Sequence, residues 1–287
     1  MQLIETLLNG VLLGGLYGLI GLGLSINFGT MRVVHLAHGD LIVLAAYFLV
    51  VVPVPVGIPP LAAAVLVVPV LFAVGWALQR FLVGRSLGRG VLPPLIVTFG
   101  ISMVVQNLVL HWATADARTL QSPLASAGLP LGGIAIPAVR LVDFAVGLAW
   151  LGLLLLFLGR TALGRALRAT SDDPDTARLM GIDPERMYAL AAGIAASTGG
   201  VAGVLLAATR TFYPTTGSDM LLVAFAVVVV GGLGSLVGTF LGGILLAIAQ
   251  LLGSHFLGPS YQLLTGHAFV LLLLVFRPRG LLPRTAP

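Results

Sequence analysis

Long apolar runs alternate with short polar connections along the chain. A helix needs about 20 mostly apolar residues to cross the hydrocarbon core of a bilayer. Runs of this kind predict spans near residues 7–28, 38–54, 60–83, 93–113, 140–159, 188–208, 219–252 and 261–276. The run 219–252 is interrupted by glycine and is long enough for two helices. The pattern therefore predicts eight spans, or nine if this run divides.

Composition places the whole chain in a membrane. Hydrophobic residues make up 58% and charged residues 9%, whereas about a quarter of the residues of a soluble domain are charged. We expect an all-α, polytopic bundle of transmembrane helices forming a single transmembrane domain over residues 1–287. Cysteine is absent, which excludes disulfides and thiolate metal sites. The net charge of +5 comes from arginines in connections and does not indicate a nucleic-acid partner.

The arginines predict the orientation, because positively charged connections stay in the cytoplasm. Arg85 and Arg89 share one connection, five arginines lie within 160–187, and three follow residue 276. These segments should be cytoplasmic. The N-terminus should then lie outside, together with the connections near 53–60, 114–137, 209–218 and 253–260. Arg118 and Arg210 lie in these outer connections, against the general bias.

The stretch 164–187 holds nine of the 25 charged side chains, 15 basic and 10 acidic, of the whole chain. Asp173 followed by Pro174 is typical of a helix start, and Gly181 is typical of a helix end. The short helix between them would place Thr176, Leu179 and Met180 on one face. Two interpretations stay open: a solvated connection between two spans, or a docking helix for a cytoplasmic protein.

The block HLAHGD contains His35, His38 and Asp40. Two imidazoles three residues apart share a helical face, but no further Cys, Glu or His lies nearby in the sequence, so we expect no metal site. We interpret His38 or Asp40 as a helix cap or a packed polar contact near the cytoplasmic interface. A role in gating is a second possibility.

Glycines recur at every fourth position in two spans, at 10, 14 and 18 and at 234, 238 and 242. This spacing lines one helix face and favours close packing of helix backbones. The segment GGLGS, with Gly231, Gly232, Gly234 and Ser235, also permits a broken helix that faces a transport pathway.

Polar side chains inside spans usually face protein or water, because lipid cannot satisfy them. The candidates are Asn27, Thr98, Ser102, Gln106, Asn107, Gln250 and His267. Gln106 and Asn107 are adjacent and cannot share one face. These residues either line a pathway or form hydrogen bonds between helices.

The phosphate-binding motif G-x-x-x-x-G-K-[ST] is absent, so the chain cannot hydrolyse ATP by that route. We expect a chain that is not an enzyme, has no catalytic residues and binds no cofactor. A self-sufficient transporter or channel would be expected to carry ionisable groups in its spans, and the predicted spans have almost none. A membrane enzyme would need a cluster of reactive groups at one depth, and only HLAHGD comes near this.

Several sequence blocks resemble the permease subunits of branched-chain amino acid ABC importers, in particular the shorter of the two permease types. The blocks are GVLLGGLYGLIGLGLSINFGTMRVVHLAHGDLIVLAAY, GRALRATSDDPDTARLMGID with AASTGGVAGVLLA, and AFAVVVVGGLGSLVGTFLGGILLAIAQ with FRPRGLL. The resemblance implies that residues 172–182 contact an ATPase, through Asp173, Asp175, Thr176, Ala177, Arg178, Leu179, Met180, Gly181 and Ile182. Ala177 and Gly181 keep the A-x-x-x-G spacing of ABC permeases, but Asp175 and Thr176 replace the usual Glu-Ala.

The resemblance also implies a set of partners in a bacterial inner membrane. These are a homologous second permease, two ATPases that use ATP and an extracytoplasmic binding protein. The implied function is to form half of a pathway for branched-chain or related amino acids. Relatives that carry urea or short amides make these solutes the alternative, and the permease pair can be a homodimer or a heterodimer.

Overall fold

A computed structural model of the chain describes residues 2–51, 60–120, 127–131 and 134–283. The longer helices are α1 (Gln2–Met31), α2 (His38–Val51), α3 (Pro60–Phe81), α4 (Leu92–Ala113), α6 (Ala138–Arg160), α9 (Pro184–Thr209), α10 (Thr216–Gly231), α11 (Leu236–Leu257) and α12 (Gln262–Phe276). The shorter elements are η1 (Val83–Ser86), α7 (Ala162–Asp172), α8 (Pro174–Leu179), η2 (Pro259–Tyr261) and the strands β1 (Gly128–Leu131) and β2 (Ile134–Pro137).

Each predicted apolar run forms a helix within the described residues, and the run 219–252 divides into α10 and α11. Seven helices of the described part are long and apolar enough to cross a membrane. The other two, α2 and α10, have 14 and 16 residues. The expected all-α bundle is therefore confirmed. The expected eight or nine spans are supported only roughly, because α2 and α10 as described are shorter than a complete crossing requires.

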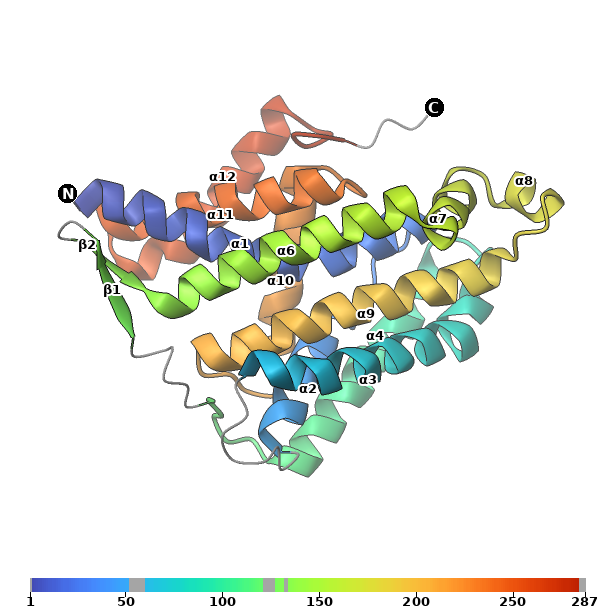
Figure 1. Ribbon diagram of the computed structural model, residues 1–287, viewed down its shortest axis with the longest axis horizontal. Coiled ribbons are helices and arrows are strands. Elements are labelled where there is room, and N and C mark those ends of the chain that lie inside the picture. Colours follow the sequence, from blue (N-terminus) through green and yellow to red (C-terminus); the bar gives the residue numbers. More distant parts are fainter. Residues whose placement is uncertain (1, 52–59, 121–126, 132–133, 284–287) are drawn as a thin grey trace.

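The bundle is built around α1 and α9. In their most apolar stretches 78% and 89% of the residues are buried, against 11% in the last helix. In Figure 1, α1, α3, α6 and α9 lie along nearly the same axis, while α10 lies across that axis. The strongest packing joins α1 to α11 and α3 to α9. The two inner helices thus form the core, and α12 lies at the edge.

Small residues set the spacing between the core helices. A Cβ at Gly14 of α1 would lie 2.3 Å from the Ile244 Cα of α11. Gly10 and Gly18 face the same helix at Ile248 and Phe240. The glycine repeat of the first span therefore serves close backbone approach, as its spacing predicts.

The second glycine-rich segment forms the turn between α10 and α11. Gly232 and Gly234 have φ angles of 106° and 80°, which other residues adopt only with strain. Beyond the turn the helices come together so closely that a Cβ at Gly231 would lie 2.2 Å from the Gly238 carbonyl oxygen. The break predicted near 231–235 is therefore a tight turn between two packed helices.

The C-terminal segment packs on this turn through its backbone. The Leu281 N–H donates to the Val230 carbonyl over 2.9 Å, and the Leu282 N–H donates to the Gly231 carbonyl over 3.0 Å. These bonds satisfy carbonyls at the end of α10 that have no partner inside the helix. The block FRPRGLL thus caps α10.

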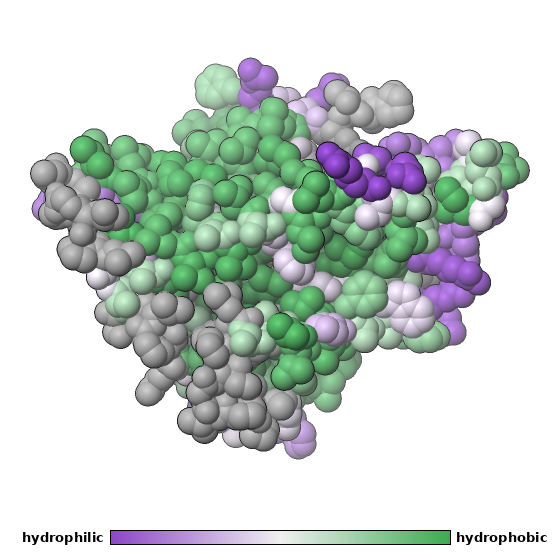
Figure 2. All heavy atoms as spheres, in the orientation of Figure 1, coloured by the Kyte–Doolittle hydropathy of each residue, from purple (hydrophilic) through white to green (hydrophobic). Residues whose placement is uncertain are grey.

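The two ends of the bundle differ in character. One end carries η1, α7, α8 and the start of α9 (Figure 1), and we call it the Arg-rich end. Figure 2 shows hydrophobic residues over most of the visible face and hydrophilic residues gathered at this end. The opposite end carries the antiparallel hairpin of β1 and β2 and a backbone bridge between Arg118 and Phe212. The all-α prediction missed this hairpin, and the predicted connection 53–60 lies almost wholly outside the described residues.

Candidate functional site

The charged stretch forms a continuous structure at the Arg-rich end. Asp173 ends α7 and begins α8, and Asp183 begins α9. The Asp173 carboxylate accepts hydrogen bonds from the Asp175 and Thr176 N–H groups over 3.0 and 3.1 Å, and from the Thr176 hydroxyl over 2.6 Å. The Thr176 hydroxyl, followed by these N–H groups, holds the pKa of Asp173 below its usual range. The predicted helix start is thus present.

Helix α8 presents its largest apolar side chains to solvent. Leu179 is 87% exposed and Met180 is 78% exposed, whereas Ala177 is 3% exposed and anchors the helix. Thr176 is also exposed, and Gly181 ends the segment with a φ of 81°. Exposed apolar side chains on a short, capped helix form a surface that the described part of the chain leaves uncovered.

A groove of about 620 Å³ lies beside α8, between α3 and η1 on one side and α8 and α9 on the other. Its charged rim includes an ion pair between Arg80 and Glu185 at 2.8 Å and one between Arg178 and Asp175 at 3.7 Å. The buried Gln79 side chain lines the groove, and neither its amide nitrogen nor its oxygen has a hydrogen-bond partner in the described part. The groove therefore has an exposed charged rim above a buried amide that is unpaired within the described residues.

A second set of predicted residues meets inside the bundle. The Gln106 Nε2 of α4 donates to the Asp40 Oδ1 at the start of α2 over 2.9 Å, and Ser102 of α4 also interacts with this carboxylate. Gly217 at the start of α10 packs so tightly here that a Cβ on it would lie 2.1 Å from Asp40 Oδ1. This arrangement joins α2, α4 and α10 by a satisfied polar contact.

His38 is a packed polar contact, as one of our interpretations predicts. Its Nε2 lies 3.0 Å from the Ile20 carbonyl oxygen, and only 1% of the residue is exposed. Ile20 is near the middle of α1, so this contact is deeper in the bundle than the expected position near an interface. Within the described residues no group of three His, Asp or Glu side chains is placed to hold a metal ion.

The other predicted polar residues differ in their surroundings. Asn107 is exposed on α4 and donates to the Met103 carbonyl of its own helix over 2.7 Å. Asn27 is buried, and its Oδ1 has no partner in the described part of the chain. Gly231, Gly232, Gly234 and Ser235 form the α10–α11 turn, where the Ser235 hydroxyl caps α11 by accepting from the Gly238 N–H.

Charged residues near the opposite end were missed by our sequence analysis. Asp143 of α6 is 1% exposed, and its Oδ1 has no hydrogen-bond partner in the described part. Arg140 and Arg210 are the charges that act on it. The sequence signal was available, because Asp143 is an acidic residue inside the predicted span 140–159.

A polar pocket of about 430 Å³ opens beside these charges, between the starts of α1 and α6 and the end of α11. Arg140 Nη1 donates to the Asn9 Oδ1 over 2.7 Å at its edge, and Glu5 and His255 also line it. Deeper in the bundle, the Tyr17 hydroxyl donates to the Gln250 Oε1 over 2.9 Å. This end of the bundle can therefore accommodate small polar solutes.

Comparison with known proteins gives one consistent result. The family described as branched-chain amino acid transport system / permease component matches residues 6–277. The chain is 30% identical to the high-affinity branched-chain amino acid transport system permease protein BraD of Pseudomonas aeruginosa, over 98% of this chain and 96% of BraD. Identity to the corresponding protein LivH of Escherichia coli K12 is also 30%, over 99% of this chain and 96% of LivH.

The likeness to a second kind of permease protein is partial. LivM of Escherichia coli K12 is 36% identical over 130 residues, which are 45% of this chain and 30% of LivM. Similarity to BraD and LivH therefore extends through the whole chain, whereas similarity to LivM covers less than half of it.

Proposed function

Because this chain belongs to the family of branched-chain amino acid transport permease components, we propose that it forms half of the translocation pathway of an ATP-binding cassette importer for branched-chain amino acids. It is of the LivH type, the shorter of the two permease types. A homologous second permease supplies the other half of the pathway. The bilayer is a bacterial inner membrane.

The exposure of Leu179 and Met180 on a capped helix is the observation that carries this proposal. An apolar face with a charged rim suits contact with a soluble protein. We assign this contact to the partner ATPases, with Asp173, Asp175, Thr176, Ala177, Arg178, Gly181 and Ile182 forming the frame that presents Leu179 and Met180. The chain has no phosphate-binding motif of its own, so the energy comes through this surface.

A displacement of α8 can be transmitted to the bundle, because hydrogen bonds hold both the end of α8 and the start of α9 in place. The Asp183 carboxylate caps α9, accepting from Glu185 and Arg186 N–H groups over 3.0 and 3.3 Å. The Ile182 N–H donates to the Ala177 carbonyl over 3.0 Å. Helix α9 is the most buried of the long helices. Displacement of α8 by an ATPase would therefore displace a core helix, which is what alternating access requires.

We place the Arg-rich end in the cytoplasm and the β1–β2 end outside, following the arginine distribution. An extracytoplasmic binding protein would then deliver its amino acid at the end that holds Asn9 and Arg140. The pocket at this end supports that orientation, because it offers both a guanidinium and the Glu5 carboxylate to a zwitterion.

A secondary transporter is the second candidate, and one observation favours it. Asp143 is a buried carboxylate inside an apolar helix, as ion-coupled transporters often have. Asp40 gives less support, because Gln106 and Ser102 already satisfy it.

Uptake measurements separate these functions. We expect proteoliposomes that contain this chain with its second permease and ATPases to accumulate leucine when ATP and the loaded binding protein are supplied. The chain alone should accumulate no leucine under a proton or sodium gradient. Gradient-driven uptake by the chain alone would contradict the proposal. Uptake of urea in place of leucine would show that urea is the substrate.

A further inference from the structure

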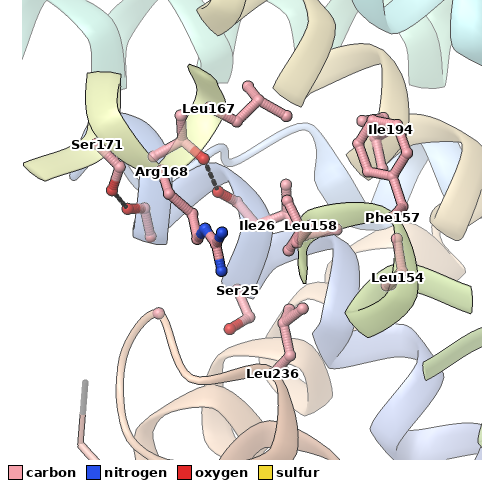
Figure 3. A pocket seen from close by; sticks show the side chains of 13 residues that line it. Ser25, Ile26, Leu154, Phe157, Leu158, Leu167, Arg168, Ser171, Ile194 and Leu236 are labelled. Carbon is pink, nitrogen blue, oxygen red and sulfur yellow. Dashed lines mark hydrogen bonds between the residues drawn. The ribbon is translucent and has the colours of Figure 1, made fainter. Parts of the chain in front are cut away.

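A small pocket opens at the Arg-rich end between α1, α6, α7, α9 and the start of α11 (Figure 3). Its wall is mainly apolar and includes Leu154 and Phe157 of α6, Leu167 of α7 and Ile194 of α9. Its volume is about 50 Å³. Because a water molecule needs about 10–15 Å³ on this measure, the pocket has room for a few waters or one small ionic group.

Arg168 of α7 supplies a positive charge at this pocket. Figure 3 shows its side chain reaching from α7 toward Ser25 and the start of α11. The described residues contain no ion pair or hydrogen bond of its guanidinium. Asp172, the acidic residue one turn away on the same helix, does not line the pocket. The guanidinium is therefore available to an anion.

Ser25 of α1 supplies a hydroxyl that has no partner. The residue is 0% exposed, and its Oγ makes no hydrogen bond within the described part. Hydroxyls in apolar helices commonly donate to the carbonyl four residues earlier, as Thr30 does to Ile26 and Thr198 does to Ile194 in this chain. The Ser25 hydroxyl instead points into the pocket, below the Arg168 guanidinium (Figure 3).

The start of α11 supplies a third attraction for negative charge. Leu236, the first residue of this 22-residue helix, lines the pocket together with Gly234. The Ser235 hydroxyl accepts from the Gly238 N–H, the other N–H groups of the first turn have no acceptor inside the helix, and the helix dipole makes this end partly positive. The residues that line the pocket include no Asp or Glu.

We propose that this pocket binds a phosphate-type oxyanion, held by the Arg168 guanidinium, the Ser25 hydroxyl and the start of α11. The oxyanion can come from the headgroup of an anionic phospholipid or from inorganic phosphate. The surroundings favour the phospholipid, because Leu155 of α6 and Leu163 of α7 are exposed on helices that line the pocket. Figure 2 likewise shows the hydrophobic face continuing up to the Arg-rich end.

A bound oxyanion would link three elements at the base of the charged segment. Ser171 of α7 already donates to the Gly29 carbonyl of α1, and Gly29 packs against Gly234 of the α10–α11 turn. The oxyanion would add a second connection between the same helices. Occupancy of the site would thus change how firmly α7 is held to the bundle. This effect does not depend on which solute the permease carries.

The test measures lipid retained by the purified full-length permease, in complex with its partner subunits where these copurify. Native mass spectrometry would count phosphatidylglycerol bound after delipidation and titration, with phosphatidylcholine as the neutral comparison. We expect Arg168→Gln to weaken phosphatidylglycerol retention about tenfold or more, and Ser25→Ala to weaken it about threefold. Arg165→Gln is the matched control, because Arg165 lies on α7, does not line the pocket and should leave retention unchanged.

Titration with sodium phosphate distinguishes the two sources. If phosphate displaces phosphatidylglycerol and this displacement depends on Arg168, the phospholipid is the source. If phosphate alone binds and its binding depends on Arg168, inorganic phosphate is the source. Equal retention of lipid and of phosphate by the parent, Arg168→Gln and Ser25→Ala would overturn the proposal. Melting temperatures of the delipidated variants would separate loss of the site from loss of the fold.

Discussion

Gln106 and Asn107 are chemically similar neighbours whose side chains have different roles. Gln106 reaches inward to Asp40, whereas Asn107 is exposed and bonds to its own helix. The sequence predicts that they face different directions, because adjacent helical residues lie 100° apart. It could not predict which one faces inward, since that depends on how α4 packs against α2.

Replacing each of these two residues by leucine tests the assignment. Gln106→Leu should lower the free energy of unfolding by about 1–3 kcal/mol, because a buried carboxylate loses a donor. Asn107→Leu should change it by less than about 0.5 kcal/mol, because its side chain is exposed. Unfolding in mixed micelles measures both, and equal losses would show that the contact with Asp40 contributes nothing.

Gly39 lies where α2 meets α10 at their first turns. A Cβ at Gly39 would lie 1.9 Å from the Gly217 carbonyl oxygen. Gly39→Ala should therefore lower the melting temperature through overpacking that costs about 1–3 kcal/mol. Gly100→Ala in α4 is the control, because its Cβ would meet nothing within 4 Å. A Gly39→Ala protein as stable as Gly100→Ala would refute the close approach of α2 and α10.

Asp143 shows what a residue-by-residue search can miss. The apolar run around it dominates any window average, so the span was recognised while its one carboxylate was overlooked. Arg140 lies three residues before Asp143 on the same helix, so its nearness was predictable. The position of Arg210 was not predictable, because Arg210 follows α9 and only the folded bundle brings it close to Asp143.

The short elements at the Arg-rich end were predictable because their signals are local. Asp173, Pro174 and Gly181 mark the bounds of α8 by capping chemistry alone. The sequence did not predict that α10 begins at Thr216, three residues before the apolar run, because Gly217 is placed there by its close contact with Asp40 of α2. The β1–β2 hairpin gave no clear signal, since its strands have only four residues each.

The cap of α8 gives a prediction for this element. Asp173→Ala should raise hydrogen exchange at the Asp175 and Thr176 amides roughly fivefold, because both amides lose their acceptor. Asp173→Asn should retain most of the protection. Because the pKa of Asp173 is lowered in the folded chain, the cap is fully present above the usual carboxyl pKa and is lost as the pH falls through the lowered value. Equal exchange in Asp173→Ala and the parent would contradict this cap.

The whole molecule has a predicted orientation, and the lack of cysteine makes it easy to test. Ala169→Cys at the Arg-rich end and Thr211→Cys at the opposite end are both exposed positions. A membrane-impermeant maleimide added to intact cells should label Thr211→Cys and leave Ala169→Cys unlabelled until the cells are opened. Labelling of Ala169→Cys in intact cells would reverse the orientation.

Copurification of the permease with its ATPases tests the central claim most directly. Burying a side chain the size of leucine or methionine contributes about 1.5–3 kcal/mol, so replacing both Leu179 and Met180 by Asp should weaken ATPase binding by roughly two to four powers of ten. The double variant should insert at normal abundance, lose its ATPases on purification and show no stimulated hydrolysis. Arg178→Ala, at the edge of the same surface, should keep them. A double variant that copurifies with its ATPases and transports like the parent would show that α8 is a solvated connection and does not drive the permease.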